Sequence, residues 1–243
     1  MRPSGCVLLQ AADVTFGYGD KAVVRNVSLD VADDGFVGII GPNGSGKTTL
    51  LRLLAGTRAP QSGRVMLDGR PLTSLPRASI ARRMAVVPQE TQLAFEYTVL
   101  EVLLMGRYPH LGAFAIEGPA DIGVAREALA ATGTADLQSR PFSTLSGGEK
   151  QRVIIAAALA QISDAVEAGF SRPVQPASSR VLLLDEPTAA LDLKYQLGVA
   201  ALLSRLNRER GMTMVLATHD LNLAAALCDT LILVRSGRDR RSR

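Results

Sequence analysis

The sequence predicts an α/β protein with one domain, built on a parallel β-sheet into which a group of helices is inserted. Strand-length apolar runs alternate with helix-length segments over much of the 243 residues. The runs at 36–40, 181–184 and 213–217 are apolar almost throughout, as is typical of strands that are buried on both faces. From about 70 to 145 the chain is mostly helical, which interrupts the alternation and predicts an inserted helical subdomain.

The N-terminal residues predict short strands at 7–11, 14–16 and 26–31. Between them, Tyr18 is flanked by glycines, and we expect a flexible loop at this point. Two interpretations of Tyr18 stay open from the local pattern. Its ring could stack on a nucleotide base, or it could be an ordinary residue of a surface turn.

A glycine-rich stretch follows the run at 36–40 and precedes a predicted helix at 50–55. It matches the pattern G-x-x-x-x-G-K-[ST] of a phosphate-binding P-loop. Glycine lets the backbone curl around an anion, so that several N–H groups and the helix N-terminus point at the phosphates. Lys47 supplies positive charge for the β- and γ-phosphates, and the Thr48 hydroxyl is placed to ligate Mg²⁺. The stretch therefore predicts a nucleoside triphosphate site, formed by Gly41, Pro42, Asn43, Gly44, Ser45, Gly46, Lys47, Thr48 and Thr49.

Two features between the P-loop and residue 140 bear on function. A short buried strand is expected at 82–87, and it presents Gln89 just beyond its end. The amide of Gln89 carries both a donor and an acceptor, which suits a contact to Mg²⁺ or water that forms and breaks. The other feature is a pair of helices, one capped by Thr98 and Glu101 and the other at 121–132. His110 lies between them, where we expect an exposed loop.

Ser146 and Glu149 have the spacing of a second capping box, which opens a predicted helix at 153–161. Gly147 and Gly148 leave the N–H groups of the first turn open. As a bare pattern this is a helix cap, but it is also a second candidate anion site. The residues that follow, 162–180, are small and polar and predict a surface linker.

Carboxylates and a histidine follow two of the buried strands. Asp185 and Glu186 come directly after the run at 181–184, and His219 follows the run at 213–217. Ligands of α/β proteins bind at the carboxyl ends of such strands. Asp185 could hold Mg²⁺ through water, and Glu186 could orient or deprotonate an attacking water. The alternatives are a surface acidic turn and a structural histidine, and the P-loop favours the functional interpretation of both.

Composition narrows the function less than the motifs do. The net charge of +4 comes largely from the basic run at 235–243, which we expect to be a frayed, solvated tail. Aromatic residues are sparse at 4%, without tryptophan, so no platform for stacking nucleic-acid bases is predicted. Cys6 and Cys228 fit no metal-binding spacing and indicate a reducing compartment. No apolar run is long enough to span a bilayer, and no signal peptide is evident.

Taken together, the motifs resemble the ATP-binding cassette of ABC transporters over essentially the whole chain. The residues that carry the resemblance are the P-loop at 41–49, Gln89, Leu145 to Glu149, Val181 to Glu186, Ala190-Leu191-Asp192 and His219. This resemblance implies a P-loop NTPase fold with a RecA-like core, an antiparallel β subdomain and a helical subdomain at about 90–160. Compared with the family, the C-terminal end of the chain is shorter than usual.

The resemblance also assigns roles within a head-to-tail homodimer that sandwiches two ATP. Each chain would supply half of each site. Tyr18 would stack on adenine, and Gln89 would couple Mg²⁺ to the membrane partner. Lys47 and His219 would contact the γ-phosphate, and Glu186 would be the general base. Ser146, Gly147 and Gly148 would close on the γ-phosphate of the opposite protomer. Glu149 of the same motif and Asp192, a cross-dimer contact, complete the expected nucleotide-binding residues.

Three stretches make the chain similar to the ATPases of importers for iron–siderophore, heme and cobalamin: 93–99, 105–110 and 218–224. The similarity implies a polytopic permease as partner, a substrate-binding protein as an indirect partner, and a location at the cytoplasmic face of the membrane. Alternatives are another importer class, an exporter, an inactive regulatory cassette, or a non-transport ABC ATPase acting on nucleic acid or the ribosome. The single P-loop and the absence of a heptad run argue against the last of these.

Overall fold

The computed structural model describes residues 6–19, 21–164, 179–189, 191–235 and 238–241. Most of the predicted linker at 162–180, and Ala190 of the motif 190–192, lie outside these ranges. The described residues contain two β-sheets and the helices that pack on them, so the expected α/β class is confirmed.

The larger sheet carries the buried strands that the sequence predicts. Its strands are β3 (Phe36–Ile40), β6 (Met84–Val87), β7 (Val181–Asp185), β8 (Thr213–Thr218), β9 (Thr230–Arg235) and β10 (Arg238–Arg241). Their order is β10-β9-β3-β8-β7-β6, and all neighbours are parallel except β9 and β10. Every residue of β3, β7 and β8 is buried, which explains why these runs are apolar on both faces. The carboxyl ends of β3, β7 and β8 therefore meet at one edge of the sheet.

The smaller sheet is antiparallel and has the order β2-β1-β4-β5. Its strands are β1 (Val7–Tyr18), β2 (Lys21–Ala32), β4 (Ser62–Leu67) and β5 (Arg70–Pro71). The break predicted between residues 11 and 14 is a register shift within β1, where Asp13 has a φ of 53°. Tyr18 was expected in a flexible loop and is instead the last residue of β1, paired with Lys21 of β2. The expected loop is wrong because Tyr18 pairs directly with Lys21 and so belongs to the sheet.

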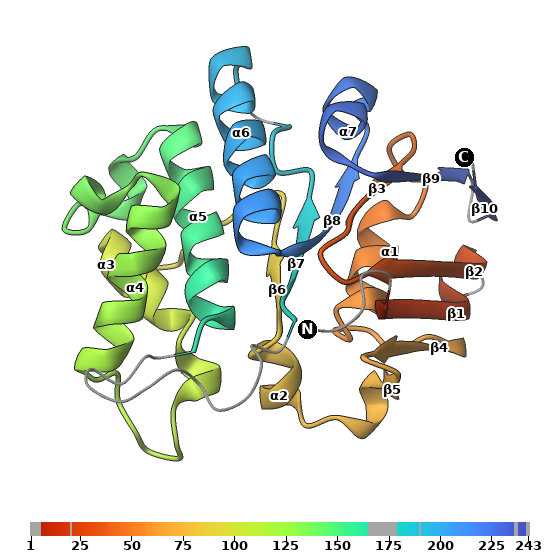
Figure 1. Ribbon diagram of the computed structural model, residues 1–243, viewed down its shortest axis with the longest axis horizontal. Coiled ribbons are helices and arrows are strands. Elements are labelled where there is room, and N and C mark those ends of the chain that lie inside the picture. The colour runs from red at the N-terminus through yellow and green to blue at the C-terminus, as the bar shows by residue number, and fades with distance from the viewer. Residues whose placement is uncertain (1–5, 20, 165–178, 190, 236–237, 242–243) are drawn as a thin grey trace.

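The helices flank both sides of the larger sheet. They are α1 (Lys47–Leu54), α2 (Arg77–Ala81), α3 (Val99–Met105), α4 (Pro119–Thr132), α5 (Gly147–Ile162), α6 (Leu193–Arg210) and α7 (Leu221–Leu227). One apolar core joins α3, α4, α5 and α6 to one face of the sheet. A second core places α1 between the larger sheet and the antiparallel sheet. Helices α3, α4 and α5 thus lie at the opposite end of the molecule from β1, β2 and β4 (Figure 1).

Two further expectations are wrong. The basic run after residue 235 was expected to be a frayed tail, but residues 238–241 form β10 and pair with β9. Pairing uses backbone groups, which any side chain leaves available at a sheet edge. His110 was expected to be exposed, but it belongs to a 3₁₀ turn (Tyr108–His110) and is half-buried. Its ring Nε2 lies 2.7 Å from the carbonyl oxygen of Gln161.

Candidate active site

The P-loop connects β3 to α1 and has the backbone geometry of a phosphate cradle. Gly46 caps α1 with a φ of 103°, a conformation that favours glycine. A Cβ atom on Gly41 would lie 2.4 Å from the carbonyl oxygen of Val234 and 2.7 Å from Ser45 Oγ. Since a backbone atom cannot swing aside, no larger residue fits at position 41 without moving the loop. The Ser45 hydroxyl is itself buried and has no hydrogen-bond partner, which suits a loop built to receive a ligand.

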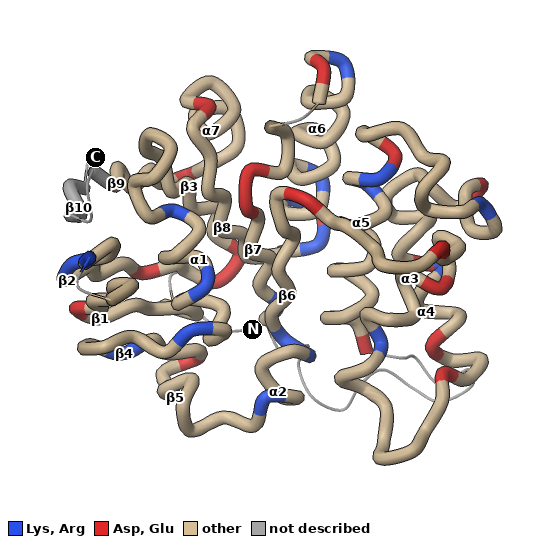
Figure 2. The backbone as a smooth tube through the Cα atoms, turned by 180° about the vertical axis from the view of Figure 1, so that it is seen from behind, with Lys and Arg blue, Asp and Glu red and all other residues tan. Residues whose placement is uncertain are grey.

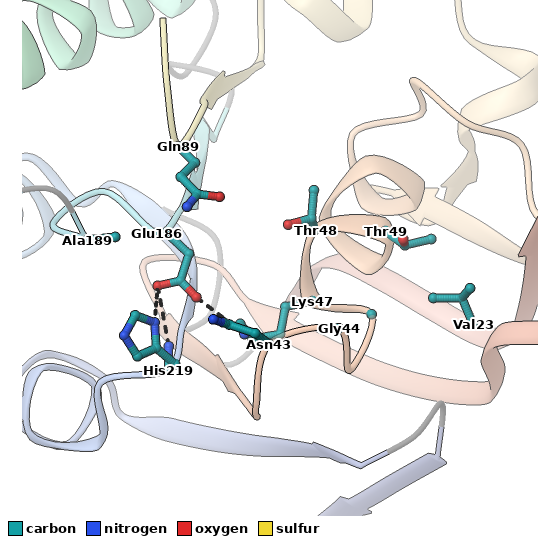
Figure 3. Close-up of a pocket in the computed structure, with 11 residues that line it drawn as sticks. Val23, Asn43, Gly44, Lys47, Thr48, Thr49, Gln89, Glu186, Ala189 and His219 are labelled. Atoms are coloured by element: carbon teal, nitrogen blue, oxygen red, sulfur yellow. Dashed lines mark hydrogen bonds and ion pairs between the residues drawn. The ribbon is translucent and has the colours of Figure 1, made fainter.

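Lys47 is the first residue of α1, and its side chain is 6% exposed. Its Nζ donates to the carbonyl oxygens of Gly41 at 2.9 Å and Pro42 at 3.3 Å. The same Nζ lies 3.3 Å from Glu186 Oε1. The ammonium group is thus folded over the P-loop and faces the carboxylate that follows β7 (Figure 3).

Glu186 stands at the centre of the charged groups. Its backbone N–H donates to Ala217 of β8 at 2.9 Å, and its φ of 48° is unusual for a residue other than glycine. Oε2 lies 2.7 Å from Nδ1 of His219 and also accepts from the backbone N–H of that residue at 3.4 Å. Oε1 faces Lys47 but makes no hydrogen bond. A buried carboxylate with one oxygen free of hydrogen bonds is arranged to accept a proton from a bound water.

Asp185 ends β7 and accepts a hydrogen bond of 3.0 Å from the Thr48 hydroxyl. Burial raises the pKa of Asp185 above its ordinary value, and the neighbouring Glu186 charge raises it further. The hydrogen bond from Thr48 and the charges of Arg52 and Lys47 oppose this rise in pKa. A hydroxyl beside a carboxylate is an oxygen pair of the kind that Mg²⁺ prefers, with water and phosphate oxygens as further ligands. The Thr48 hydroxyl and the Asp185 carboxylate therefore fit the Mg²⁺ that the sequence predicts.

A pocket of about 560 Å³ brings most of these groups together, although Asp185 does not line it. It is lined by the P-loop residues Asn43, Gly44, Gly46, Lys47, Thr48 and Thr49, together with Gln89, Glu186 and His219. Figure 3 shows Gln89, Glu186 and His219 facing the P-loop from β6, β7 and β8. Val23 and Ala189 also line the pocket, and the sequence analysis missed both. Nothing in the sequence around Val23 indicates that it belongs to the pocket, because only the fold of β2 brings it beside Gly46.

Tyr18 does not line this pocket. Its side chain is 46% exposed, and its ring packs edge-on against Phe16 with centroids 5.1 Å apart. Tyr18 nevertheless contacts α1, and its hydrogen bond with Thr49 is the main cause that lowers the pKa of Tyr18. Tyr18 thus flanks the P-loop helix from outside the pocket.

The second candidate anion site is a well-formed helix cap that also lies outside this pocket. Ser146 Oγ accepts from the backbone N–H of Glu149 at 3.4 Å, and a Glu149 carboxylate oxygen accepts from the backbone N–H of Ser146 at 2.8 Å. The Glu149 carboxylate accepts from both the backbone N–H and the hydroxyl of Ser146, and these two hydrogen bonds lower the pKa of Glu149. A Cβ atom on Gly148 would fall 2.1 Å from the ring of Tyr195, so only glycine allows α6 this close to α5. The cap of α5 therefore packs directly against the start of α6.

Asp192 begins α6, where its side chain accepts from the backbone N–H of Tyr195 at 3.1 Å. Asp192 joins Ser146, Gly147, Gly148 and Glu149 as the predicted site residues on α5 and α6 that do not line the P-loop pocket. Helices α5 and α1 lie on opposite sides of β7 in both views of the molecule (Figures 1 and 2). The capped start of α5, the second candidate anion site, is therefore separate from the P-loop pocket.

Comparison with known proteins identifies the family. The family described as "ABC transporter" matches residues 24–166. The chain belongs to the ABC transporter family. This ABC cassette is 43% identical over 231 residues to the hemin import ATP-binding protein HmuV of Gloeobacter violaceus, covering 95% of the chain and 80% of that protein. It is 44% identical over 230 residues to the uncharacterised ABC transporter ATP-binding protein YvrA of Bacillus subtilis. That match covers 94% of the chain but only 48% of YvrA, so the cassette spans about half the length of this relative.

Solved structures agree with this assignment. The cassette resembles a putative metal-chelate type ABC transporter in an inward-facing conformation, with a TM-score of 0.81 and 30% identity, covering 98% of this chain and 83% of that one. It also resembles the dimeric cassette MJ0796, with a TM-score of 0.76 and 29% identity, covering 97% and 99% of the two chains. The expected P-loop NTPase fold is thereby confirmed.

Proposed function

We propose that this ABC cassette is the ATP-hydrolysing subunit of an importer for a metal chelate such as an iron–siderophore, heme or cobalamin. One observation carries the hydrolytic part: Glu186 is buried beside the P-loop, between Lys47 Nζ at 3.3 Å and His219 Nδ1 at 2.7 Å. A base, a phosphate-binding cation and a histidine donor thus face the same pocket. This is the set of groups that attack of water on a γ-phosphate requires.

Each residue has a distinct task in the proposed reaction. Lys47 exchanges the carbonyl oxygens of the P-loop for phosphate oxygens, which are stronger acceptors because they are charged. Its departure from Glu186 leaves Oε1 as the site that takes a proton from the attacking water. His219 donates from Nδ1 to the other oxygen of Glu186 and keeps it in place, and a ring protonated at both nitrogens also donates from Nε2 toward the γ-phosphate. The left-handed backbone of Glu186, held by Ala217, aims the carboxylate into the pocket.

Thr48 and Asp185 are the residues that would hold Mg²⁺, with Gln89 at the pocket wall. When bound, Mg²⁺ neutralises charge that develops on the β- and γ-phosphates. Among the described residues, no three His, Cys, Asp or Glu side chains gather into a metal site. This fits a metal that takes most of its ligands from phosphate and water rather than from protein.

A homodimer is the second part of the proposal. The capped start of α5 offers N–H groups to an anion, yet it lies outside the pocket that holds Lys47 and Glu186. Two identical chains related by a two-fold axis can each place this cap over the partner's P-loop. Ser146, Gly147, Gly148, Glu149 and Asp192 would then complete the nucleotide site of the opposite protomer, and Tyr18 would stack on adenine. The dimeric cassette MJ0796 supports this arrangement.

Import is supported by the relatives, one of which is named for hemin import and one for metal-chelate transport. In the part of the chain that the structure describes, no helix is long and apolar enough to cross a membrane. We therefore assign the transmembrane path to a separate polytopic permease, with this ABC cassette bound at its cytoplasmic face. A substrate-binding protein would deliver the chelate to the opposite face.

The variant Glu186→Gln tests the hydrolytic mechanism. Glutamine keeps the size and a hydrogen-bonding oxygen but cannot act as the base, so ATP binding should persist while turnover falls by roughly 10²–10⁴-fold. ATP binding is measured by equilibrium titration, and phosphate release is measured in the cassette–permease complex. Hydrolysis at the wild-type rate would show that another group is the base.

The same variant tests the transport function, because an ATP-trapped complex should be captured with its partner from native membranes. A polytopic permease that carries a metal chelate would support the proposal. A permease for another substrate would make this a cassette of a different importer or exporter class. Ribosomes or DNA without a membrane protein would mean that the cassette does not act in transport.

A further inference from the structure

A second pocket lies at the C-terminal end of α1, the end opposite the P-loop. Its volume is about 390 Å³, and it is enclosed by α1, β4 and the segment from Leu72 to α2. It shares no residue with the nucleotide pocket. Its floor is apolar and buried, since it is formed by Leu53 (0% exposed), Val65 (5%), Leu72 (7%) and Ile80 (8%). A pocket of this size holds one small organic molecule.

The rim of this pocket is basic. Arg58, Arg64 and Arg77 line it, and all three are exposed. No acidic residue lines it, and in the described ranges none of the three arginines forms an ion pair with a carboxylate. Asp68, at the end of β4, lies outside the pocket and 3.6 Å from Arg83. Figure 2 shows basic positions on β4 and on α2, the elements that form two of its walls.

One of these arginines is held in place by the protein itself. Arg77 Nη1 donates to the carbonyl oxygen of Gly56 at 3.1 Å, just past the end of α1. A guanidinium group has five N–H donors, so this bond leaves most of the group available to a ligand. Gly56 also lines the pocket, and its φ of 67° is a left-handed conformation that favours glycine just after the end of α1.

We propose that this pocket binds a small amphipathic anion: a carboxylate, phosphate or sulfonate group attached to an apolar body. Guanidinium groups pair with such anions through two parallel hydrogen bonds, whereas the apolar floor takes the rest of the molecule. The described pocket has no aromatic lining on which a base could stack, which makes a nucleotide a poor fit. The occupant is a single dissolved molecule and not a membrane surface, because the apolar groups lie at the bottom of a concavity.

The proposal is tested with 8-anilinonaphthalene-1-sulfonate, a fluorescent amphipathic anion, and the whole chain. The chain has no tryptophan, so the emission of the probe is measured without that background. We expect saturable binding of one probe per chain, displaced by octanoate and not by octanol. We also expect saturating Mg-ATP to leave the bound probe in place, because the two pockets are separate.

Paired variants locate the binding site. The double variant Arg58→Gln/Arg77→Gln should weaken probe binding at least tenfold, with thermal unfolding unchanged because both side chains are exposed. The matched control Arg25→Gln/Arg126→Gln removes the same charge from exposed positions outside the pocket and should bind as the wild type does. Thr73→Trp should block the pocket with a large side chain at an exposed lining position.

Four results would overturn the proposal. These are equal binding by the double variant and the wild type, displacement of the probe by Mg-ATP, equal displacement by octanol and octanoate, and binding of anionic phosphatidylglycerol vesicles without binding of the dissolved probe.

Discussion

Arg107 provides the sharpest test of how the helices α3, α4 and α5 are held together. Its side chain is 1% exposed and, from just after the end of α3, reaches two helices, α4 and α5. Nε donates to Asp121 Oδ1 at 3.0 Å, near the start of α4. Nη1 donates to the carbonyl oxygens of Ala160 and Ser163 at the end of α5. The change Arg107→Met keeps most of the apolar stem but is shorter than arginine and removes every side-chain donor.

The expected loss in the free energy of unfolding follows from the groups that lose Arg107 as a partner. Removal of one member of a buried ion pair costs about 3–5 kcal/mol, because the other charge loses its partner. Asp121 keeps a hydrogen bond of 3.1 Å from the backbone N–H of Gly118, and its side chain stays 15% exposed. These two facts place the loss near the lower end, at about 3–4 kcal/mol. For a chain of this length, such a loss lowers Tm by roughly 6–16 °C.

Equilibrium unfolding in urea, together with thermal unfolding, measures this loss. The control is Arg126→Met, which removes an exposed arginine of α4 and should change the free energy of unfolding by less than about 0.5 kcal/mol. A loss of unfolding free energy below about 1 kcal/mol in Arg107→Met would refute the reasoning. It would mean that the hydrogen bonds and the ion pair of Arg107 barely exceed the free-energy cost of burying its charge.

The pH dependence of Arg107→Met offers a second check. Burial alone would raise the pKa of Asp121, but the Gly118 N–H and Arg107 lower it below its ordinary value. A lowered carboxyl pKa stabilises the fold at neutral pH, and this contribution is lost as the pH falls through the pKa of the folded state. In the variant the acid-dependent part of the stability should shrink.

Three further tests, two of them with a control variant, concern the P-loop, the cap of α5 and His110, and they use unfolding and nucleotide titration. Gly41→Ala should cost about 1–3 kcal/mol and weaken ATP binding, because its Cβ meets backbone; Gly44→Ala, which has open space, should cost only about 1 kcal/mol for its left-handed φ. Ser146→Ala should cost about 1 kcal/mol through the lost cap, whereas Ser146→Thr should cost little. Burial lowers the pKa of His110 below 6.5, so its share of stability should be complete above that pH and fall below it. His110→Gln should flatten this decline, and an unchanged pH profile would contradict it.

Local chemistry explains which parts of the structure the sequence could predict. The P-loop, the two capping boxes and the strands β3, β7 and β8 each depend on residues that are adjacent in the chain. A capping box needs only a hydroxyl and a carboxylate three residues apart, so Thr98 and Ser146 could be recognised directly. The same holds for Asp185 and Glu186, which follow a run with no polar residue.

Partners that are distant in the sequence explain the errors. His110 is half-buried because Gln161 lies beside it, and these residues are 51 positions apart. Tyr18 is in a strand because it pairs with Lys21 of β2, whereas the glycines that flank it had indicated a loop. Residues 238–241 form a strand because β9 offers them an edge, a property of the sheet that the basic sequence does not express.

The packing of α5 on α6 explains why the capped start of α5 stays apart from the P-loop of its own chain. Gly148 lets α6 approach closely enough for Tyr195 to occupy the space of its missing side chain, and Asp192 caps α6 at the same point. A cap that is fixed against α6 in this way cannot fold over the P-loop of its own chain without breaking that contact. A second chain can cover the P-loop without such a cost. The small residue at position 148 therefore favours completion of the site between chains rather than within one.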